Sequence, residues 1–320
     1  MALSHDPLWP RAGDWPAPTD TAAGTGADHV ARWDAAVLGA PASRTSLSPT
    51  GAHETPAAIR AALRRYSPTL MGPPPVDLGE VLCIADAGDV ADPDGPVGEA
   101  ALRAGIRGLA AASDLVIALG GDNSITYAVT QGAGAAGLIT LDAHFDLRDG
   151  VSNGSPVRRL VEDGLDPARI VQIGIADFAN SAAYAQRAAD LGIRVVTLDD
   201  LRARGIADVV AEALAVAGGG LAAAGSGGSA CSGGGIHLDI DVDVCDRAVA
   251  PGCPASVPGG LQAWELRALV RGIARGDRVR SADIVEVDAT ADAADGRTVR
   301  LAALCVLELL AGVHLRKGPA

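Results

Sequence analysis

The sequence predicts a three-layer α/β fold built around a parallel β-sheet. Short apolar runs alternate along the chain with longer amphipathic segments, which is the pattern of repeated β-α-β units. About eight such runs follow one another, and strands of a parallel sheet that is buried on both faces are expected to be this apolar. A closed eightfold barrel shows the same alternation and stays open as an alternative. With 320 residues, 48% of them hydrophobic and 20% charged, the chain is long and apolar enough to bury a sizeable core.

Residues 1–33 precede the alternation and are rich in Pro, Asp and Gly. We expect an irregular arm whose indoles, Trp9 and Trp15, dock onto a single domain that covers residues 34–320. The expected strands lie within residues 35–41, 80–88, 114–121, 137–144, 169–177, 193–200, 235–244 and 281–289, and amphipathic helices within 54–66 and 261–276. The Gly- and Ser-rich residues 217–235 predict a flexible surface loop.

The charge balance excludes two classes of partner. The chain has 39 acidic and 26 basic residues, a net charge of −13, so unselective binding to nucleic acid or to an anionic membrane is not expected. The N-terminus is polar, and no apolar run is long enough to span a bilayer.

The cysteines are widely spaced and form no C-x-x-C pair, which favours reduced thiols in a cytoplasm over a disulfide framework or a zinc–thiolate site. They are Cys83, Cys231, Cys245, Cys253 and Cys305.

Polar residues follow four of the predicted strands, and these strand ends are where sites form in parallel α/β sheets. In "GGDNS", two glycines allow a sharp turn before Asp122, Asn123 and Ser124 begin the next helix. Capping of that helix by Asn or Ser explains these residues without any function. In "ADIVEVD", Glu286 follows an apolar strand and could face a shared cleft, although a lone acid at a strand end is more often not functional.

The other two strand ends carry the strongest signals. In "LDAHFD", Asp142, His144 and Asp146 alternate, so an extended chain sends all three side chains to one side. Burying such a row without a cation is costly. A second stretch, "HLDIDVDVCD", interleaves acids with Leu, Ile and Val, so it begins inside the sheet, and the crowded carboxylates repel one another unless a cation neutralises them. Its acids are Asp239, Asp241, Asp243 and Asp246.

One imidazole among many carboxylates favours Mn²⁺ over Zn²⁺. Carboxylates shared between two such ions would let the pair activate water at neutral pH. The sequence therefore indicates a hydrolytic metal centre at the strand ends.

Five ordered motifs resemble those of the ureohydrolase family, which includes arginase, agmatinase and formimidoylglutamase: "GGDNS", "DAHFD", "SNGSPV", "DVDVCDRAVAPGCPASVPGGL" and "ADIVEVD". The resemblance runs from about residue 34 to 312. It implies an arginase-like fold with a central eight-stranded parallel sheet, a homo-oligomer, and a dinuclear Mn²⁺ centre that hydrolyses a guanidino or amidino C–N bond. A metal-dependent deacetylase can share the sheet architecture, but the motif order favours the ureohydrolases.

Matching the motifs residue by residue implies which side chains do what. Asp142 and Asp241 would bridge the two ions, Asp146 would orient the attacking water, and Glu286 would receive the cationic group of the substrate. Asp246 matches the following motif acid, and Asp239 falls one step early and is expected to be structural. The implied metal ligands are Asn123, Asp142, His144, Asp146, Asp241 and Asp243.

Two departures from the family pattern concern histidines. Asn123 stands where the family usually has a metal-binding His, and an amide oxygen is a weaker, neutral donor, so we expect that metal site to be weakened. Asn153 stands where the family often has a His that moves protons, and an amide is neither acid nor base near neutral pH. Proton delivery would then fall to Asp146, Asp246, His53 or water.

The motifs "SNGSPVRRL", "QIGIADFANS" and "VDVCDRAVAPGCP" look most like those of formimidoylglutamases. That substrate carries two carboxylates, which arginine binds well. Candidate substrate-binding residues are Asn153, Arg158, Arg159, Asn180 and Arg44. At least one of Arg158 and Arg159 is expected to be a plain solvent-facing residue. Agmatine or another guanidino compound is an alternative substrate, and a catalytically silent binding or regulatory homologue is an alternative of a different class.

Overall fold

Eight parallel strands form one open sheet in the computed structural model, which describes residues 6–18, 32–219 and 234–318. The order across the sheet is β4–β1–β5–β10–β9–β6–β7–β8. The predicted eight-stranded parallel sheet is therefore confirmed, and the barrel alternative is wrong because β4 and β8 are edges. The strands are β1 (Trp33–Ala40), β4 (Ile84–Asp89), β5 (Ser113–Gly120), β6 (Gly137–Leu141), β7 (Ile170–Ile175), β8 (Arg194–Thr197), β9 (Ile236–Asp241) and β10 (Val279–Val285).

Each strand lies in or largely overlaps one predicted apolar run, and the differences are at the ends. β1 begins at Trp33, one residue before the predicted start of the domain. The run at 80–88 starts in a short helix, α2 (Leu78–Val81), that Asp77 caps by accepting a hydrogen bond from the Gly79 amide. A two-stranded hairpin of β2 (Thr69–Leu70) and β3 (Val76–Asp77) precedes that helix and was not predicted.

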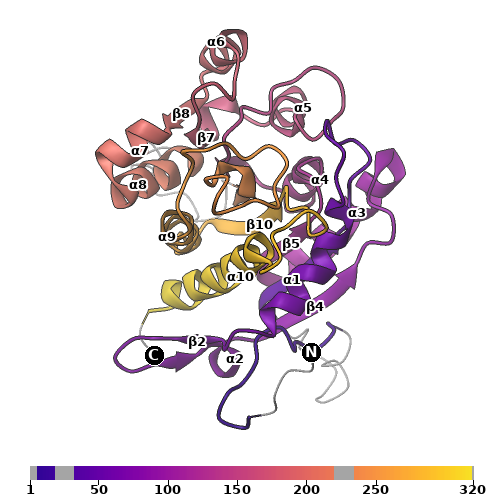
Figure 1. Cartoon of the computed structure of the whole chain (residues 1–320), viewed down its shortest axis with the longest axis vertical. Helices are drawn as coiled ribbons and strands as arrows, with labels where there is room; N and C mark the ends of the chain where they lie inside the picture. The colour runs from indigo at the N-terminus through magenta and orange to yellow at the C-terminus, as the bar shows by residue number, and fades with distance from the viewer. Residues whose placement is uncertain (1–5, 19–31, 220–233, 319–320) are drawn as a thin grey trace, which may run out of the picture.

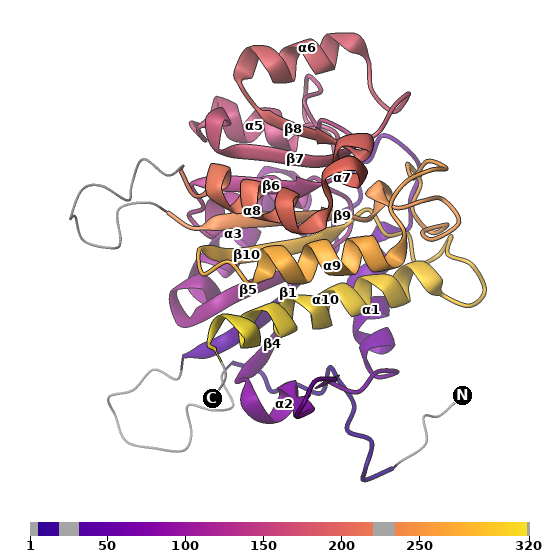
Figure 2. The same ribbon diagram turned by 90° about the vertical axis from the view of Figure 1, so that its left-hand side faces the viewer.

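Helices cover both faces of the sheet and complete the three layers (Figure 1). One face carries α1, α7, α8, α9 and α10, which pack against one another in a row, and the other carries α3 to α6. Figure 2 shows the strands stacked from β4 to β8, with α8, α9 and α10 in front of them. The helices are α1 (Thr55–Leu63), α3 (Gly95–Ala112), α4 (Ile125–Gly132), α5 (Pro156–Glu162), α6 (Ala182–Leu191), α7 (Leu198–Arg204), α8 (Ile206–Ala217), α9 (Ala263–Ala274) and α10 (Arg297–Arg316).

α10 is the one helix among the described residues that is long and apolar enough to cross a membrane. Its most apolar window is 72% buried inside the fold, against α1 and α9. A helix that is apolar on all sides and mostly buried by its own protein is a core helix, so the burial of α10 explains its high hydropathy.

Residues 6–18 of the N-terminal arm form no helix or strand, and Trp15 packs against the main core, whereas Trp9 is 51% exposed. Only one of the two indoles therefore docks as predicted. Most of the predicted Gly/Ser loop, including Cys231, lies outside the described residues. The other four cysteines are free thiols; Cys83 is exposed and the remaining three are buried.

Candidate metal centre

The four strands that end in polar motifs, β5, β10, β9 and β6, are consecutive neighbours in the sheet. Their carboxyl ends point to the same edge, where the loops after β9 (orange) and β10 (yellow) gather on the right of Figure 2. The fold thus brings together residues that are more than 160 positions apart, such as Asn123 and Glu286, whose backbone amide and carboxylate are 2.8 Å apart.

Asp142, His144 and Asp243 form the tightest cluster at this edge, with one ligand atom from each within 4.8 Å of the others. His144 Nδ1 lies 2.7 Å from Asp243 Oδ2 and 3.6 Å from Asp142 Oδ1. The second oxygen of Asp142, Oδ2, is buried and has no hydrogen-bond partner among the described residues. A buried carboxylate oxygen without a partner is costly in a protein interior, so this donor set fits a bound cation.

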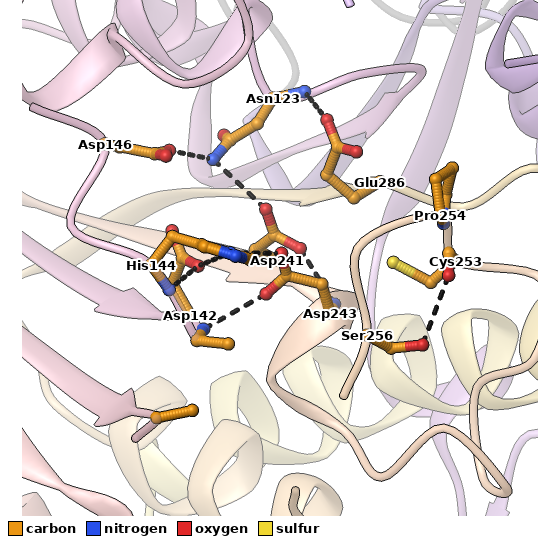
Figure 3. Close-up of polar contacts among 12 residues, drawn as sticks. Asn123, Asp142, His144, Asp146, Asp241, Asp243, Cys253, Pro254, Ser256 and Glu286 are labelled. Atoms are coloured by element: carbon orange, nitrogen blue, oxygen red, sulfur yellow. Dashed lines mark hydrogen bonds and ion pairs between the residues drawn. The ribbon is translucent and has the colours of Figure 1, made fainter. Parts of the chain in front are cut away.

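The second part of the centre lies around Asn123 (Figure 3). The Asn123 side-chain nitrogen donates to Asp146 Oδ2 at 2.5 Å and to Asp241 Oδ2 at 3.2 Å. Asp241 connects the two parts, because its other oxygen accepts the Asp243 backbone amide at 2.8 Å. All six residues that the sequence indicated as ligands therefore lie in one continuous group.

Without a cation, this group holds protons instead. Burial and the neighbouring Asp243 raise the pKa of Asp142 to about 7. Burial likewise raises the pKa values of Asp146 and Asp241 well above their usual range. Burial disfavours the charged form of His144, but Asp243 and Asp142 outweigh it and raise the His144 pKa to about 12. The protonated imidazole thus balances part of the negative charge of Asp142 and Asp243.

The backbone at the centre is strained at two acids. Asp146 has φ 52° and Glu286 has φ 61°, two of the three positive φ values at non-glycine positions among the described residues. Such conformations cost about 1–3 kcal/mol each and persist where surrounding contacts impose them. Both side chains turn into the same cavity, so the strain serves to aim carboxylates.

Glu286 is almost fully buried beside the acidic cluster. Its Oε1 accepts hydrogen bonds from the Asn123 backbone amide and, at 2.9 Å, from Asn153 Nδ2. Burial raises the Glu286 pKa to about 7, with Asp122 and Asp243 adding to the effect. Asn153 also accepts the Leu47 amide on its Oδ1 at 3.0 Å, so it ties the loop before α1 to Glu286.

A cavity of about 260 Å³ opens over these residues. His144, Asp146, Asp241, Asp243 and Glu286 form its polar floor, and the loops around Leu47, Asn153 and Asn180 form its walls. Arg148 is the only Arg or Lys among the described residues that lines it. The Arg148 guanidinium makes no hydrogen bond or ion pair with any residue that the structure describes.

The three arginines that the sequence indicated as substrate-binding residues lie outside the cavity lining. Arg44 pairs with Asp92 and Asp94. Arg158 donates to the Arg148 and Gly150 carbonyls and pairs with Glu162. Arg159 binds Glu99 through both terminal nitrogens and stacks on Tyr127, 3.6 Å from the ring centroid. We therefore withdraw these three as substrate-binding candidates, because their guanidinium groups already have partners elsewhere.

Two of the predicted proton donors, Asp246 and His53, do not line the cavity. Asp246 accepts the Ala248 and Gly259 amides, both at 2.7 Å, and so closes the loop after β9 instead of facing the cavity. His53 is exposed, beside Glu54, and does not line the cavity. Asn180 does line it, but its amide is used to brace the backbone before and after His144, by accepting from Phe145 N and donating to the Ala143 carbonyl.

Other residues differ from the simplest expectations. Neither Asn123 nor Ser124 caps α4 with its side chain; the Ser124 hydroxyl donates instead to Asp122 at 2.5 Å. Asp239 lies inside β9, fully buried and outside the cavity, paired across the sheet with Asp283 of β10. This burial within β9, away from the cavity, supports the structural role expected from its early position in the motif.

Sequence reasoning missed Arg148 and Thr126. The first is two residues after Asp146 in the same loop, which was a usable signal. The second is buried in α4, where its hydroxyl lies 2.6 Å from Asn123 Oδ1, and nothing in the sequence distinguishes it from an ordinary core threonine.

Comparisons with known proteins agree with this geometry. The formimidoylglutamase of Bacillus subtilis (strain 168) is 34% identical over 310 residues, which cover 90% of this chain and 92% of that protein. The crystal structure of formimidoylglutamase from Bacillus subtilis subsp. subtilis str. 168 superposes with a TM-score of 0.81 at 30% identity, covering 98% of this chain and 95% of that one. Proclavaminate amidino hydrolase from Streptomyces clavuligerus gives a TM-score of 0.79 at 26% identity, covering 96% and 97%.

The model of the arginase family matches residues 33–312, which include all eight strands of the sheet and every residue of the acidic centre. The same span contains the five motifs on which the resemblance was based. A deacetylase that shares only the sheet architecture is therefore set aside. The chain belongs to the arginase family.

Proposed function

We propose that this protein is a cytoplasmic, Mn²⁺-dependent amidine hydrolase that converts N-formimidoyl-L-glutamate and water to L-glutamate and formamide. As an arginase-family hydrolase it acts on a C–N bond that is not a peptide bond. The similarity to formimidoylglutamases over nine-tenths of the chain supports this substrate. We also propose a homo-oligomer with two ions per chain, the second bound more weakly.

The donor set supports Mn²⁺. Four aspartates and one histidine offer oxygen-rich ligation with a single imidazole, which suits Mn²⁺ better than Zn²⁺. When bound, divalent ions lower the pKa of water and stabilise negative charge that develops on the reacting carbon's substituents. The ions would be held near the buried oxygen of Asp142, which has no partner among the described residues, and near Asp241, whose two oxygens contact Asn123 and Asp243.

The chain's own residues bind and orient the substrate around that chemistry. Glu286, fixed by Asn123 and Asn153, would pair with the cationic amidinium group, which in turn favours the ionised carboxylate. Asp146 would accept a hydrogen bond from the attacking water, because its strained backbone aims the carboxylate into the cavity. Asn153 holds Glu286 but cannot itself move a proton, so the leaving amine would be protonated by Asp146 or by water.

One observation favours this substrate over agmatine: the guanidinium of Arg148, which has no partner in the described part of the chain, lies at a cavity whose floor is acidic. A substrate with a cationic head and an anionic tail matches that distribution of charge. Formimidoylglutamate has an amidinium at one end and two carboxylates at the other. Agmatine is cationic at both ends, so its ammonium would approach Arg148 and be repelled.

The direct test is a substrate panel with the Mn²⁺-loaded protein. We expect glutamate and formamide from formimidoylglutamate, with at most slow release of urea from agmatine or from a guanidino acid. Faster urea release than formamide release would reassign the substrate within the family. No turnover of any of them, together with no bound metal after loading, would favour a catalytically silent homologue.

A further inference from the structure

The Asn123 side chain lies between two kinds of partner, and its two ends face opposite ways. The Nδ2 end donates to the carboxylates of Asp146 and Asp241 (Figure 3). The Oδ1 end lies 2.6 Å from the hydroxyl of Thr126. In this orientation the amide presents its positive end to two carboxylates that the proposed function assigns to a metal ion, so it competes with that ion.

Thr126 is fully buried in α4 and has a second neighbour. Its Oγ1 also lies 2.9 Å from Asp283 Oδ2, a buried carboxylate of β10. A hydroxyl has one proton to donate but can also accept, so Thr126 can donate to Asn123 or to Asp283, not to both. His237 Nε2 lies 3.2 Å from the same Asp283 oxygen and can donate a hydrogen bond to it when Thr126 donates to Asn123.

Two hydrogen-bond arrangements therefore satisfy this group. In the first, Thr126 donates to Asn123 Oδ1, and the Asn123 nitrogen donates to Asp146 and Asp241. In the second, the amide is turned over: its nitrogen donates to Thr126, Thr126 donates to Asp283, and the amide oxygen faces the two carboxylates. The two ends of an amide have nearly the same shape, and the Asn123 backbone is held in both cases by Glu286.

A divalent ion distinguishes the two arrangements. Next to Asp146 and Asp241, a cation repels the amide N–H groups and attracts the amide oxygen, which is an acceptable hard ligand. We propose that Thr126 is a positioning residue that lets the Asn123 amide turn over, so that the second ion binds through the Asn123 oxygen. This inference rests on the proposed two-ion centre but not on the identity of the substrate.

Loss of the Thr126 hydroxyl should destabilise the second hydrogen-bond arrangement more than the first. Removing the Thr126 hydroxyl takes one hydrogen bond from the first arrangement but two from the second, one of them to the Asp283 carboxylate. Asp142, His144 and Asp243, which would hold the first ion, make no hydrogen bond with the Thr126 side chain, whose partners are Asn123 and Asp283. Loss of the hydroxyl should therefore weaken only the second ion.

The test compares Thr126→Val, which keeps the shape, with Thr126→Ser, which keeps the hydroxyl. Titration of metal-free protein with Mn²⁺, followed by calorimetry and by electron paramagnetic resonance of the ion pair, gives the two affinities separately. We expect Thr126→Val to weaken the second ion by about tenfold or more and to leave the first within about twofold. Thr126→Ser should keep both affinities within about threefold of those of the unmodified protein.

Equal weakening of both ions, or a second-ion affinity that Thr126→Val leaves unchanged, would overturn the proposal. So would the absence of any second binding event in the unmodified protein. If the valine variant does not fold, crystal structures of the unmodified protein with and without Mn²⁺ decide. Asn123 must then coordinate through its oxygen with its nitrogen on Thr126; an amide that keeps its nitrogen toward Asp146 contradicts the inference. Formimidoylglutamate turnover, measured separately, can succeed or fail independently of these results.

Discussion

Asp241 lies where the two parts of the acidic centre meet, with one oxygen on Asn123 and the other on the Asp243 amide. Asp241→Asn removes a negative charge from this position while keeping its shape. We expect bound Mn²⁺ to fall and kcat/KM to drop by about a hundredfold or more, since the neutral amide is a weaker ligand for a divalent ion than the carboxylate it replaces. Metal content by mass spectrometry and initial rates measure both. Near-normal turnover would show that the centre is misassigned.

Asp246 is the matched control for that change. It lies five residues further on but uses both oxygens to hold backbone amides of its own loop. Asp246→Asn should keep the metal content of the unmodified protein and lower its stability by about 1 kcal/mol, the scale of one hydrogen bond. Loss of metal in this variant would contradict its placement outside the centre.

Arg148 should determine which end group the cavity accepts. Replacing it by Met keeps the apolar stem but removes the one guanidinium that the described residues contribute to the cavity lining. Charge-assisted hydrogen bonds contribute about 1.5–3 kcal/mol, so we expect kcat/KM for formimidoylglutamate to fall about 10- to 100-fold, mainly through KM. Arg44→Met, which breaks ion pairs outside the cavity, should change KM less than about twofold. Equal effects of both variants would exclude Arg148 from substrate recognition.

The sequence located the acidic centre but not the residues around it, for a physical reason. Asp241 ends β9, Asp142 directly follows β6 and His144 lies three residues after it, so the sheet places all three at its carboxyl edge. Arg148 lies further along a loop, and its side chain reaches the cavity by crossing Gly154, where an added Cβ would lie 2.8 Å from Arg148 Cδ. Arg159 had the same charge and a nearby position, yet Tyr127 and Glu99 hold it away.

At the level of elements, the turn between β5 and α4 depends on a close approach of two backbones. A Cβ added to Gly121 would lie 1.9 Å from the carbonyl oxygen of Ala42. Gly121→Ala must therefore push this turn away from the neighbouring loop, and we expect it to lower the free energy of unfolding by about 1–3 kcal/mol and to weaken metal binding through Asn123. Chemical denaturation and Mn²⁺ titration test the two effects.

Gly108 gives a matched control in a helix interior. It is exposed in α3, and an added Cβ there meets no atom within 4 Å. Gly108→Ala should raise the free energy of unfolding by about 0.5–1 kcal/mol, because Ala restricts the unfolded chain and favours helix. The glycines of the turn were predicted to serve a sharp bend, but at Gly121 the reason is the packing of Ala42, which only the tertiary structure reveals.

The inner strands were predictable because they are largely apolar runs that the sheet buries on both faces, whereas the edge strands β4 and β8 are partly exposed. The exact strand ends were not, since the last apolar residues of a run can continue into a turn. Val242–Val244, for example, form a 3-10 turn after β9, in which Asp241 accepts the Asp243 amide. This turn separates Asp241 from Asp243 and lets them face different parts of the centre, an arrangement that strand alternation alone would not produce.

For the whole molecule, the buried acids make the stability of the metal-free protein depend on pH in an unusual direction. The pKa of Asp142 is raised to about 7 and that of His144 to about 12, whereas unfolded Asp and His titrate at about 3.9 and 6.5. Between those limits the folded state binds protons that the unfolded state releases. Stability is therefore greatest at the acid end of this range and is lost as the pH rises.

We accordingly expect the Tm of the metal-free protein to fall between pH 5.5 and 8.5, by at least the roughly 1–2 °C that about 1 kcal/mol represents in a chain of 320 residues. Mn²⁺ requires deprotonated ligands, so its binding releases protons and should raise the Tm more at pH 8.5 than at pH 5.5. Asp142→Asn removes one of the titrating groups. The Tm of the metal-free variant should therefore fall less between pH 5.5 and 8.5, and Mn²⁺ should raise its Tm by less at pH 8.5. Calorimetric scans at four pH values, with and without Mn²⁺, measure both. A metal-free Tm that rises steadily over this range would mean that the centre is not buried and proton-bound as the structure has it.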